Sequence, residues 1–195
     1  MALHTGVLSK PGMLDAVVWN IDFIEDWSSG KCVSGMHGPQ DCELDRYELC
    51  AKHMMTNADG WSFVHCCFVN QPNLCGTEGL AAPADDDEAI PACTLLNNAT
   101  ATAQLQKCVS DLSFGDFPSL QQCATNDTSA DWAKASGAAT AAATQHPLWL
   151  EVDGTQVDVT DTNVTAWSGK VLDAVCAAFT KKNPAATAPA ACAGL

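Results

Sequence analysis

The chain has 195 residues, of which 47% are hydrophobic and 16% are charged. These values suit one folded domain, or one domain with a large insertion, and exclude wholesale disorder. The 9 lysines and arginines stand against 23 aspartates and glutamates, which gives a formal net charge of -14. This charge excludes the basic footprint that nucleic acids require and disfavours an anionic membrane surface. Apolar runs such as 61–69 are far shorter than the roughly 20 residues that span a bilayer, so we expect no membrane span.

The first third of the chain contains one predicted strand and one predicted helix. Residues 16–24 are apolar, β-branched and aromatic, which predicts a strand. After a turn and a loop, Asp41 can cap a helix over 42–55. The apolar face of that helix consists of Leu44, Tyr47, Ala51 and Met54. The apolar run 61–69 is either a strand or a buried helix, because periodicity alone does not distinguish them.

The middle of the chain is predicted to be a loop followed by helices. Residues 71–88 form the loop, which ends in the acidic run 85–88. We interpret this run as a solvated helix N-terminus rather than a metal site, since carboxylates there complement the helix dipole. Apolar spacing predicts a helix over 100–112, and a high alanine content predicts another over 129–144.

The C-terminal third has the clearest pattern. Residues 147–159 alternate apolar and polar side chains about Asp153-Gly154, which predicts a β-hairpin. A helix is predicted over 163–180, and an alanine- and proline-rich tail over 183–195. The predicted apolar face of the helix comprises Val164, Trp167, Val171, Leu172, Val175, Cys176 and Phe179. We expect Trp167, Val171 and Val175 to be buried against Leu148, Leu150 or their neighbours.

Cysteine usage points to an oxidising compartment. There are 11 cysteines, which favours several structural bridges and leaves at least one thiol without an intramolecular partner. None forms a C-x-x-C motif, which argues against zinc and against a thioredoxin-type redox site. We expect one of the adjacent Cys66 and Cys67 to be bridged and the other packed, because neighbouring side chains diverge. A strained vicinal disulfide is the alternative, and Cys32 is a further candidate for the lone thiol.

Three N-x-[ST] sequons support a secretory route. They make Asn98, Asn126 and Asn163 candidate glycosylation sites. Residues 1–15 contain neither the basic region nor the apolar region of a signal peptide. A secreted protein with this sequence would therefore be a mature or truncated chain.

Other catalytic signatures are missing from the sequence. The five histidines form no H-E-x-x-H motif, and there is no G-x-S-x-G or phosphate-binding glycine loop. We therefore expect neither a metal nor another cofactor.

One segment resembles the signature of the gamma-interferon-inducible lysosomal thiol reductase (GILT) family, C-Q-H-G-x2-E-C-x2-N-x4-C. The residues that match at the signature spacing are His37, Gly38, Cys42 and Cys50. The residues that differ from the signature are Met36, Asp41 and Asp45, which replace Gln, Glu and Asn. The opening cysteine position holds Gly35, and Cys32 lies three residues earlier as a candidate substitute.

The resemblance continues over residues 16–192. The stretch 145–154 is similar to the family's Val-Pro-Trp strand, which ends in Asp-Gly or Asn-Gly, although His146 stands at the Val position. Cys176 and Cys192 match the last two cysteines of the family. We predict that they are bridged, because the tail would otherwise fray.

The resemblance implies a single α/β, thioredoxin-like domain over 1–182, with a cysteine-rich helical insertion at about 31–125 and a tail tied by Cys192. Family members reduce protein disulfides in an acidic compartment through a C-x-x-C motif upstream of the strand matched by 16–24. Only 15 residues precede that strand here, and they contain no cysteine. We therefore expect an N-terminally incomplete fold with no identifiable catalytic residue.

The resemblance also assigns a role to the loop before the hairpin. Pro147 would be the cis-proline that faces the active site and pairs with an extended substrate, with His146 beside it. An ordinary trans-proline at the start of an edge strand is the alternative.

Two functions remain open from the sequence. The first is a GILT-like thiol:disulfide oxidoreductase that lacks its C-x-x-C unit in this chain and acts on disulfide-bonded proteins. The second is a catalytically inactive, secreted, disulfide-stapled binding protein on the same scaffold. Both imply a lysosomal or extracellular location, and the sequence leaves the oligomeric state and the disulfide connectivity open.

Overall fold

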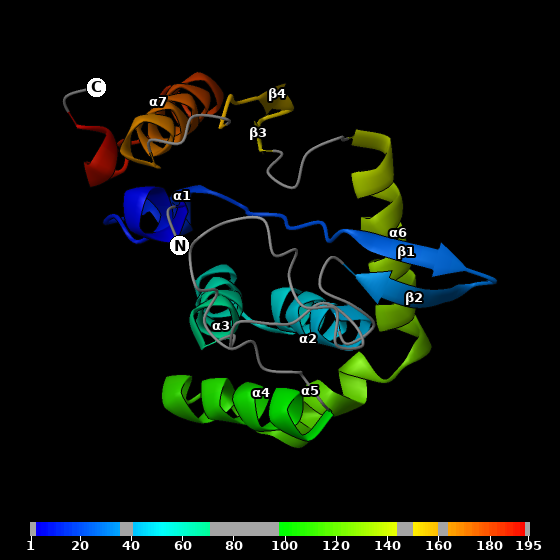
Figure 1. Ribbon diagram of the computed structural model, residues 1–195. Coiled ribbons are helices and arrows are strands. Elements are labelled where there is room, and N and C mark those ends of the chain that lie inside the picture. The colour runs from blue at the N-terminus through cyan, green and yellow to red at the C-terminus, as the bar shows by residue number, and fades with distance from the viewer. Residues whose placement is uncertain (1–2, 36–40, 71–97, 144–149, 160–163, 194–195) are drawn as a thin grey trace, which may run out of the picture. The chain divides into compact units, whose positions relative to one another are not determined.

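The computed structural model describes residues 3–35, 41–70, 98–143, 150–159 and 164–193 (Figure 1). These residues are mostly helical and include two small antiparallel sheets of two strands each. No helix in these ranges is long and apolar enough to cross a membrane.

The chain divides into two compact units. We call Ile21–Ala142 the central unit, and Met1–Asn20 together with Ala143–Leu195 the terminal unit. The central unit is therefore inserted, in sequence, between the two parts of the terminal unit. It contains the whole of the cysteine-rich stretch at about 31–125 that the resemblance assigns to an insertion.

Helices dominate the central unit. They are α2 (Asp41–Met54), α3 (Asn57–Asn70), α4 (Asn98–Leu112), α5 (Phe117–Ala124) and α6 (Asp127–Ala143). Helix α2 packs against α3 and α5, and α3 also packs against α4. The core between them consists of Leu44, Tyr47, Cys50, Ala51, Phe63, Cys67, Leu105, Cys108, Val109, Leu120, Cys123 and Ala124. The helices predicted over 42–55, 100–112 and 129–144 are thus present, with small differences at their ends.

Capping side chains explain where these helices begin. Thr56 and Asp59 cap α3: the Thr56 hydroxyl accepts the Asp59 N–H at 3.2 Å and donates to the Asp59 carboxylate at 2.8 Å. This cap shows that the apolar run 61–69 belongs to a helix. Asp116 caps α5 by accepting the Ser119 N–H at 3.0 Å. Helix α5 was not predicted from the sequence, because it is short and has a proline in its first turn.

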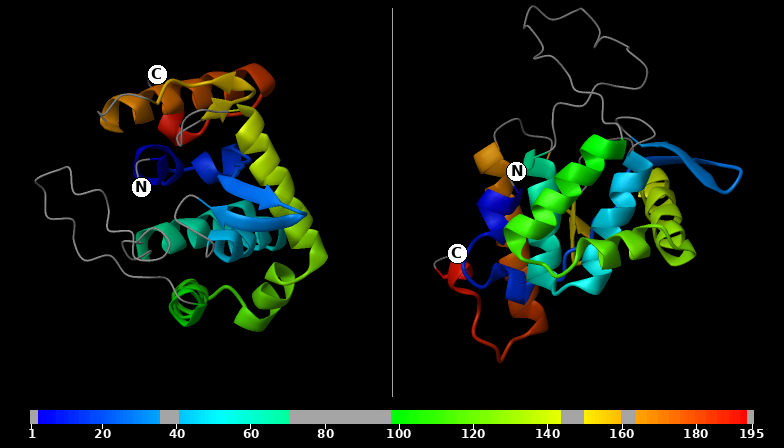
Figure 2. Two further views of the ribbon diagram at one scale, coloured as in Figure 1. Left: turned by 45° about the vertical axis from the view of Figure 1, so that its right-hand side comes forward. Right: turned by 90° about the horizontal axis from the view of Figure 1, so that it is seen from below.

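A β-hairpin lies against both α2 and α6. It pairs β1 (Glu25–Ser28) with β2 (Lys31–Gly35) through a tight turn in which both central residues have positive φ. A Cβ atom on Gly137 of α6 would lie only 3.1 Å from Nε1 of Trp27, so a larger residue there would require the Trp27 side chain to shift. Figure 2 shows the hairpin beside both helices in two views.

The prediction of a strand over residues 16–24 is wrong. Helix α1 (Met13–Ala16) ends where that strand should begin, and the chain then runs extended, outside either sheet, until β1. The Phe23 N–H donates to the Ser136 hydroxyl at 2.7 Å, and the Thr140 hydroxyl donates to the Phe23 carbonyl at 2.9 Å. Side chains of α6 therefore satisfy backbone groups that a neighbouring strand would otherwise bond.

The terminal unit is built around α7 (Val164–Lys182). Helix α7 packs against the π-helical turn η1 (His4–Leu8), the strand β3 (Glu151–Val152) and the 3-10 turn η3 (Ala190–Cys192). Gly6 of η1 lies directly on α7, because a Cβ atom there would be 2.4 Å from the Cβ of Ser168. The N-terminal residues and the C-terminal third thus share one unit.

The hairpin predicted about Asp153-Gly154 is present. Strand β3 pairs antiparallel with β4 (Thr155–Gln156), and both turn residues have positive φ. Strand β3 packs on α7, whose Val171 and Val175 are buried, whereas Trp167 is only half-buried. Leu148 lies outside the described residues.

Candidate functional site

The two signature cysteines both serve as structural bridges. Cys42, in the first turn of α2, is bonded to Cys32 of β2, and Cys50 is bonded to Cys123 of α5. Cys32 is therefore not the lone thiol. His37 and Gly38, the other two matching signature residues, lie outside the described residues. The signature segment thus contributes covalent ties between α2 and its two neighbours.

The adjacent cysteines of α3 have different environments, as expected from the sequence. Cys66 is bonded to Cys108 of α4, while Cys67 keeps a free thiol that is only 4% exposed. Burial, and then the nearby Glu48 carboxylate, raise the pKa of Cys67. A buried thiol with a raised pKa is a poor nucleophile, because the thiolate is the attacking species. Cys75 and Cys93 lie outside the described residues.

The C-terminal site residues are only partly described. Cys176 and Cys192 are bonded, with their Cα atoms 5.5 Å apart, which is the pairing predicted from the sequence. His146 and Pro147 lie outside the described residues, so the expected cis-proline stays a prediction.

The structure describes the side chain of one of the three candidate glycosylation sites. Asn126 is exposed at the start of α6, where its side-chain oxygen accepts the Ser129 N–H at 2.8 Å. This contact uses only the oxygen, and an N-linked glycan would attach to the nitrogen. Asn163 lies outside the described residues, and the side chain of Asn98 is not described.

A cluster of four acidic side chains is the most unusual group in the described structure. We call it the carboxyl cluster: Glu25 comes from β1, and Asp41, Asp45 and Glu48 come from α2. The three from α2 are spaced i, i+4, i+7, so they form one stripe along the helix. All three are at least nine-tenths buried, and Glu25 is half-buried. Carboxylates are seldom buried unless they are paired, so this arrangement requires compensation.

Proton binding supplies that compensation. Burial raises the pKa of Asp45 well above its usual range, and the nearby Glu48, Glu25 and Asp41 carboxylates raise it further. Burial, and then the Asp41 carboxylate, raise the pKa of Glu48 to about 8. Burial also raises the pKa of Glu25. Glu48 is therefore a neutral acid in the folded protein at mildly acidic pH, and the same causes favour the neutral form of Asp45.

Arg46 contributes little of this compensation. Arg46 acts on Glu25 from a distance, but its guanidinium donates to the Ser129 hydroxyl at 2.8 and 3.0 Å. It also donates to the Asn126 carbonyl. The arginine is thus committed to the start of α6 rather than paired with a carboxylate of the cluster.

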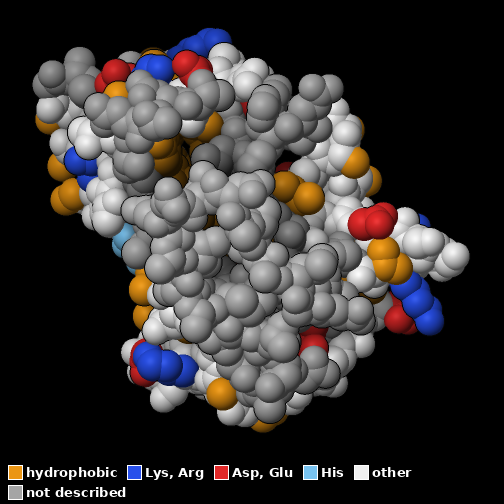
Figure 3. Space-filling view, viewed as in Figure 1, with side chains coloured by type: hydrophobic (Ala, Val, Ile, Leu, Met, Phe, Trp, Pro, Cys, Tyr) orange, Lys and Arg blue, Asp and Glu red, His pale blue; other side chains and the backbone are white. Residues whose placement is uncertain are grey.

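The carboxyl cluster is not a metal site. Across the described ranges, no group of three histidine, cysteine or acidic side chains has a geometry that could hold a metal ion. On the face drawn in Figure 3, the described lysine and arginine side chains are scattered rather than gathered.

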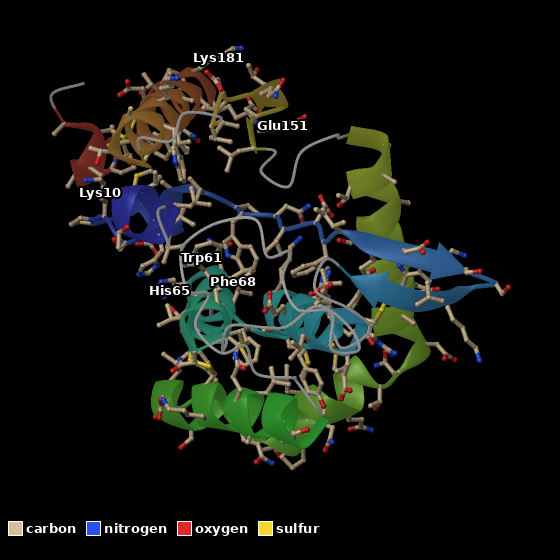
Figure 4. All side chains as sticks on the ribbon, viewed as in Figure 1. Lys10, Trp61, His65, Phe68, Glu151 and Lys181 are labelled. Carbon is tan, nitrogen blue, oxygen red and sulfur yellow. A yellow bond between two sulfur atoms is a disulfide. The ribbon has the colours of Figure 1, made fainter. Side chains whose placement is uncertain are left out.

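Helix α3 contributes Phe63 and Cys67 to the core and carries three further ring side chains. Trp61, His65 and Phe68 are spaced i, i+4, i+7 on this helix, and Figure 4 labels all three on α3. Trp61 is 8% exposed and Phe68 is 46% exposed. The disulfide of Cys66 joins α3 to α4.

The carboxyl cluster was not predicted from the sequence, because acidic residues are ordinarily surface groups. The sequence nevertheless contains a pattern that could have indicated the cluster. The stripe of Asp41, Asp45 and Glu48 runs beside the predicted apolar face of the same helix. Asp45 also stands where the GILT signature has asparagine, and a protonated aspartic acid can donate a hydrogen bond as asparagine does.

The scan of protein-family models and the searches of curated proteins and of solved structures find no match to this chain.

Proposed function

We propose that this chain is a disulfide-stapled binding protein of the secretory pathway, built on a GILT-like, thioredoxin-like scaffold, that does not turn over disulfides with its described cysteines. One observation carries the proposal: eight of the nine described cysteines are bonded in four disulfides, and the ninth, Cys67, is buried. The described cysteines therefore hold helices together rather than exchange with a substrate.

The chemistry of the remaining described thiol agrees with this proposal. Reduction of a substrate disulfide needs an accessible thiolate and a second thiol that resolves the mixed disulfide. Cys67 is buried, its pKa is raised, and its neighbour Cys66 is bonded to Cys108. Four bridges among the described cysteines also suit an oxidising compartment.

The partner class of such a protein would be an extended or disulfide-bonded protein segment. The resemblance supports this class, since the loop at Pro147 corresponds to the family's cis-proline loop, which exposes backbone for pairing. Lysosomal or extracellular placement and N-glycosylation belong to the same proposal.

A GILT-like reductase is the second candidate, because the match at His37, Gly38, Cys42 and Cys50 is specific in its spacing. In that case a C-x-x-C unit encoded upstream of Met1 would supply the chemistry. The genomic reading frame upstream of Met1 distinguishes the candidates, since a signal peptide followed by C-x-x-C favours the enzyme.

An activity assay gives the direct test. The 195-residue chain is mixed with a disulfide-bonded protein and excess small thiol, in mildly acidic and in neutral buffer. We expect no multiple turnover above the small-thiol background. Steady turnover that one cysteine-to-serine substitution abolishes would refute the proposal. Turnover by an upstream-extended protein alone would support the second candidate.

A further inference from the structure

Two carboxyl groups from different elements meet beneath the hairpin. The carboxyl groups of Glu25 of β1 and Asp45 of α2 lie within hydrogen-bonding reach of each other. Oε2 of Glu25 accepts the indole N–H of Trp27 at 2.8 Å, and its buried Oε1 has no other donor among the described residues. Two ionised carboxylates have no proton to share, so a hydrogen bond joins the pair only when one of them is protonated. Asp45 is the more deeply buried and takes the proton, and Glu25 accepts.

The surroundings make ionisation of this pair unfavourable. On α2, Asp41 and Glu48 both add negative charge at Asp45, and Glu48 also acts on the Cys67 thiol of α3. A buried oxygen of Glu48 has no hydrogen-bond partner in the described part of the chain. Arg46 provides the positive charge, and its side chain is bonded to the start of α6.

Helix α6 faces the hairpin with uncharged groups. Ser136 and Thr140 hold the backbone of Phe23, and Gly137 lies against Trp27 and the Cβ of Glu25. These groups offer Glu25 no charge that could compensate a second buried carboxylate. The carboxyl contact between β1 and α2 therefore depends on the shared proton.

We infer that Glu25, Asp45 and Glu48 form an acid-closed latch, which fastens the β1–β2 hairpin to α2 while protons are bound and loosens it when they leave. Loss of the proton from Asp45 replaces a hydrogen bond by two facing negative charges. Loss of the proton from Glu48 adds a further charge to the buried stripe of α2. Each step transfers one proton to water and leaves one carboxylate, with no other change in bonding.

The Cys32–Cys42 disulfide limits how far the latch can open. It ties β2 to the first turn of α2, so the hairpin stays attached after the carboxyl contact is lost. Gly35 at the end of β2 lies against the Asp41 side chain, and a Cβ atom there would be 2.3 Å from the Cβ of Asp41. We therefore expect β1 to move more than β2.

The direction of the pH dependence follows from the proton balance. The folded protein holds protons on Asp45 and Glu48 that the unfolded chain releases. The pKa of Glu48 is about 8 in the fold, against an ordinary value of 4.5. Its neutral form stabilises the closed latch fully below the ordinary pKa, and this contribution is lost as the pH rises through the pKa in the fold.

Hydrogen exchange of the hairpin amides tests the latch. After correction for the intrinsic pH dependence, the protection factors of β1 should fall at least about tenfold between about pH 5 and about pH 8, since one pKa unit corresponds to a factor of ten. In the double variant Asp45→Asn/Glu48→Gln the protection should stay constant, because the introduced amides are neutral at every pH. The amide introduced at position 45 can still donate to Glu25, so the contact is kept.

The matched control is Glu43→Gln, which changes an acid of the same helix outside the carboxyl cluster and should behave like the wild type. Wild-type protection that does not change with pH would overturn the inference, and so would a double variant that is as pH-sensitive as the control. If the double variant does not fold, the wild type still decides. The infrared band of a protonated carboxyl group must persist at about pH 6.5, well above ordinary carboxyl pKa values, and its absence there would overturn the latch.

Discussion

One side of α2 carries Leu44, Tyr47 and Cys50 and packs against α3 and α5, whereas the neighbouring stripe carries Asp41, Asp45 and Glu48. Both are buried, but they are stabilised differently. The apolar side gains from water exclusion and from a disulfide, neither of which involves a proton between mild acid and neutral pH. The acidic stripe is stable only while protons are bound. A single helix thus joins a pH-independent contact to a pH-dependent one.

The largest expected effect comes from the bridge on the apolar side. Cys50 and Cys123 enclose a loop with a sequence separation of 73 residues, and Cys50 is fully buried. Replacing both by alanine should lower the free energy of unfolding by about 4 kcal/mol in the chain-entropy model. Urea unfolding measures this loss.

The control is the shorter bridge. Cys32 and Cys42 are 10 residues apart, so removing both should cost about 3 kcal/mol, less than the longer loop. If removing Cys32–Cys42 lowered the free energy of unfolding more than removing Cys50–Cys123, the conclusion that the bridge on the apolar side of α2 stabilises the fold more would be wrong.

The terminal unit offers a bridge outside this helix. Replacing Cys176 and Cys192, which are 16 residues apart, should cost about 3 kcal/mol and release η3 from α7. Hydrogen exchange should show the loss in α7 and leave the protection of α2 unchanged. Equal loss of protection in α2 would show that the two units unfold together.

A smaller effect is expected from the acidic stripe. Glu48→Gln keeps the shape of the side chain and removes its titration. The wild type should lose stability as the pH rises from 4.5 through the Glu48 pKa of about 8, and the variant should lose less. At about pH 8 the difference should be at least about 1 kcal/mol in favour of the variant, relative to about pH 5. Chemical unfolding at several pH values measures it.

The smallest effect concerns the start of α6, where Arg46 of α2 is anchored. Asn126→Asp keeps an acceptor for the Ser129 N–H and should change stability by less than about 0.5 kcal/mol. Asn126→Ala removes the cap and should cost about 1 kcal/mol. Mass spectrometry of protein secreted from eukaryotic cells should show a glycan in the wild type and none at this site in either variant.

The sequence predicted the elements whose residues carry local signals. The apolar spacing of 42–55, the Asp153-Gly154 turn and the helix over 163–180 each act within a few residues, and all three are present. The segment 16–24 has strand-like composition but bonds to side chains of α6, more than 100 residues away. Such a partner leaves no trace in local composition.

The candidate site was harder to foresee for a related reason. The pairing of Cys176 with Cys192 could be predicted from the sequence, because the tail between them would fray without a bridge. Cys50 and Cys123 are far apart in sequence and meet only through the packing of α2 on α5. The spacing of the acidic stripe is visible in the sequence. Its burial depends on the hairpin, whose position follows from a disulfide and from the close approach at Gly137.

The buried thiol of Cys67 has a consequence for recovery after unfolding. In the folded protein it is shielded and its pKa is raised, so the bridge of Cys66 beside it is safe from attack. In an unfolded chain the same thiol regains its ordinary acidity and can exchange with any of the four described disulfides. Refolding yield should therefore fall with every cycle at alkaline pH. In acid, where thiols stay protonated and exchange is slow, the original bridges survive and the chain returns to its native connectivity.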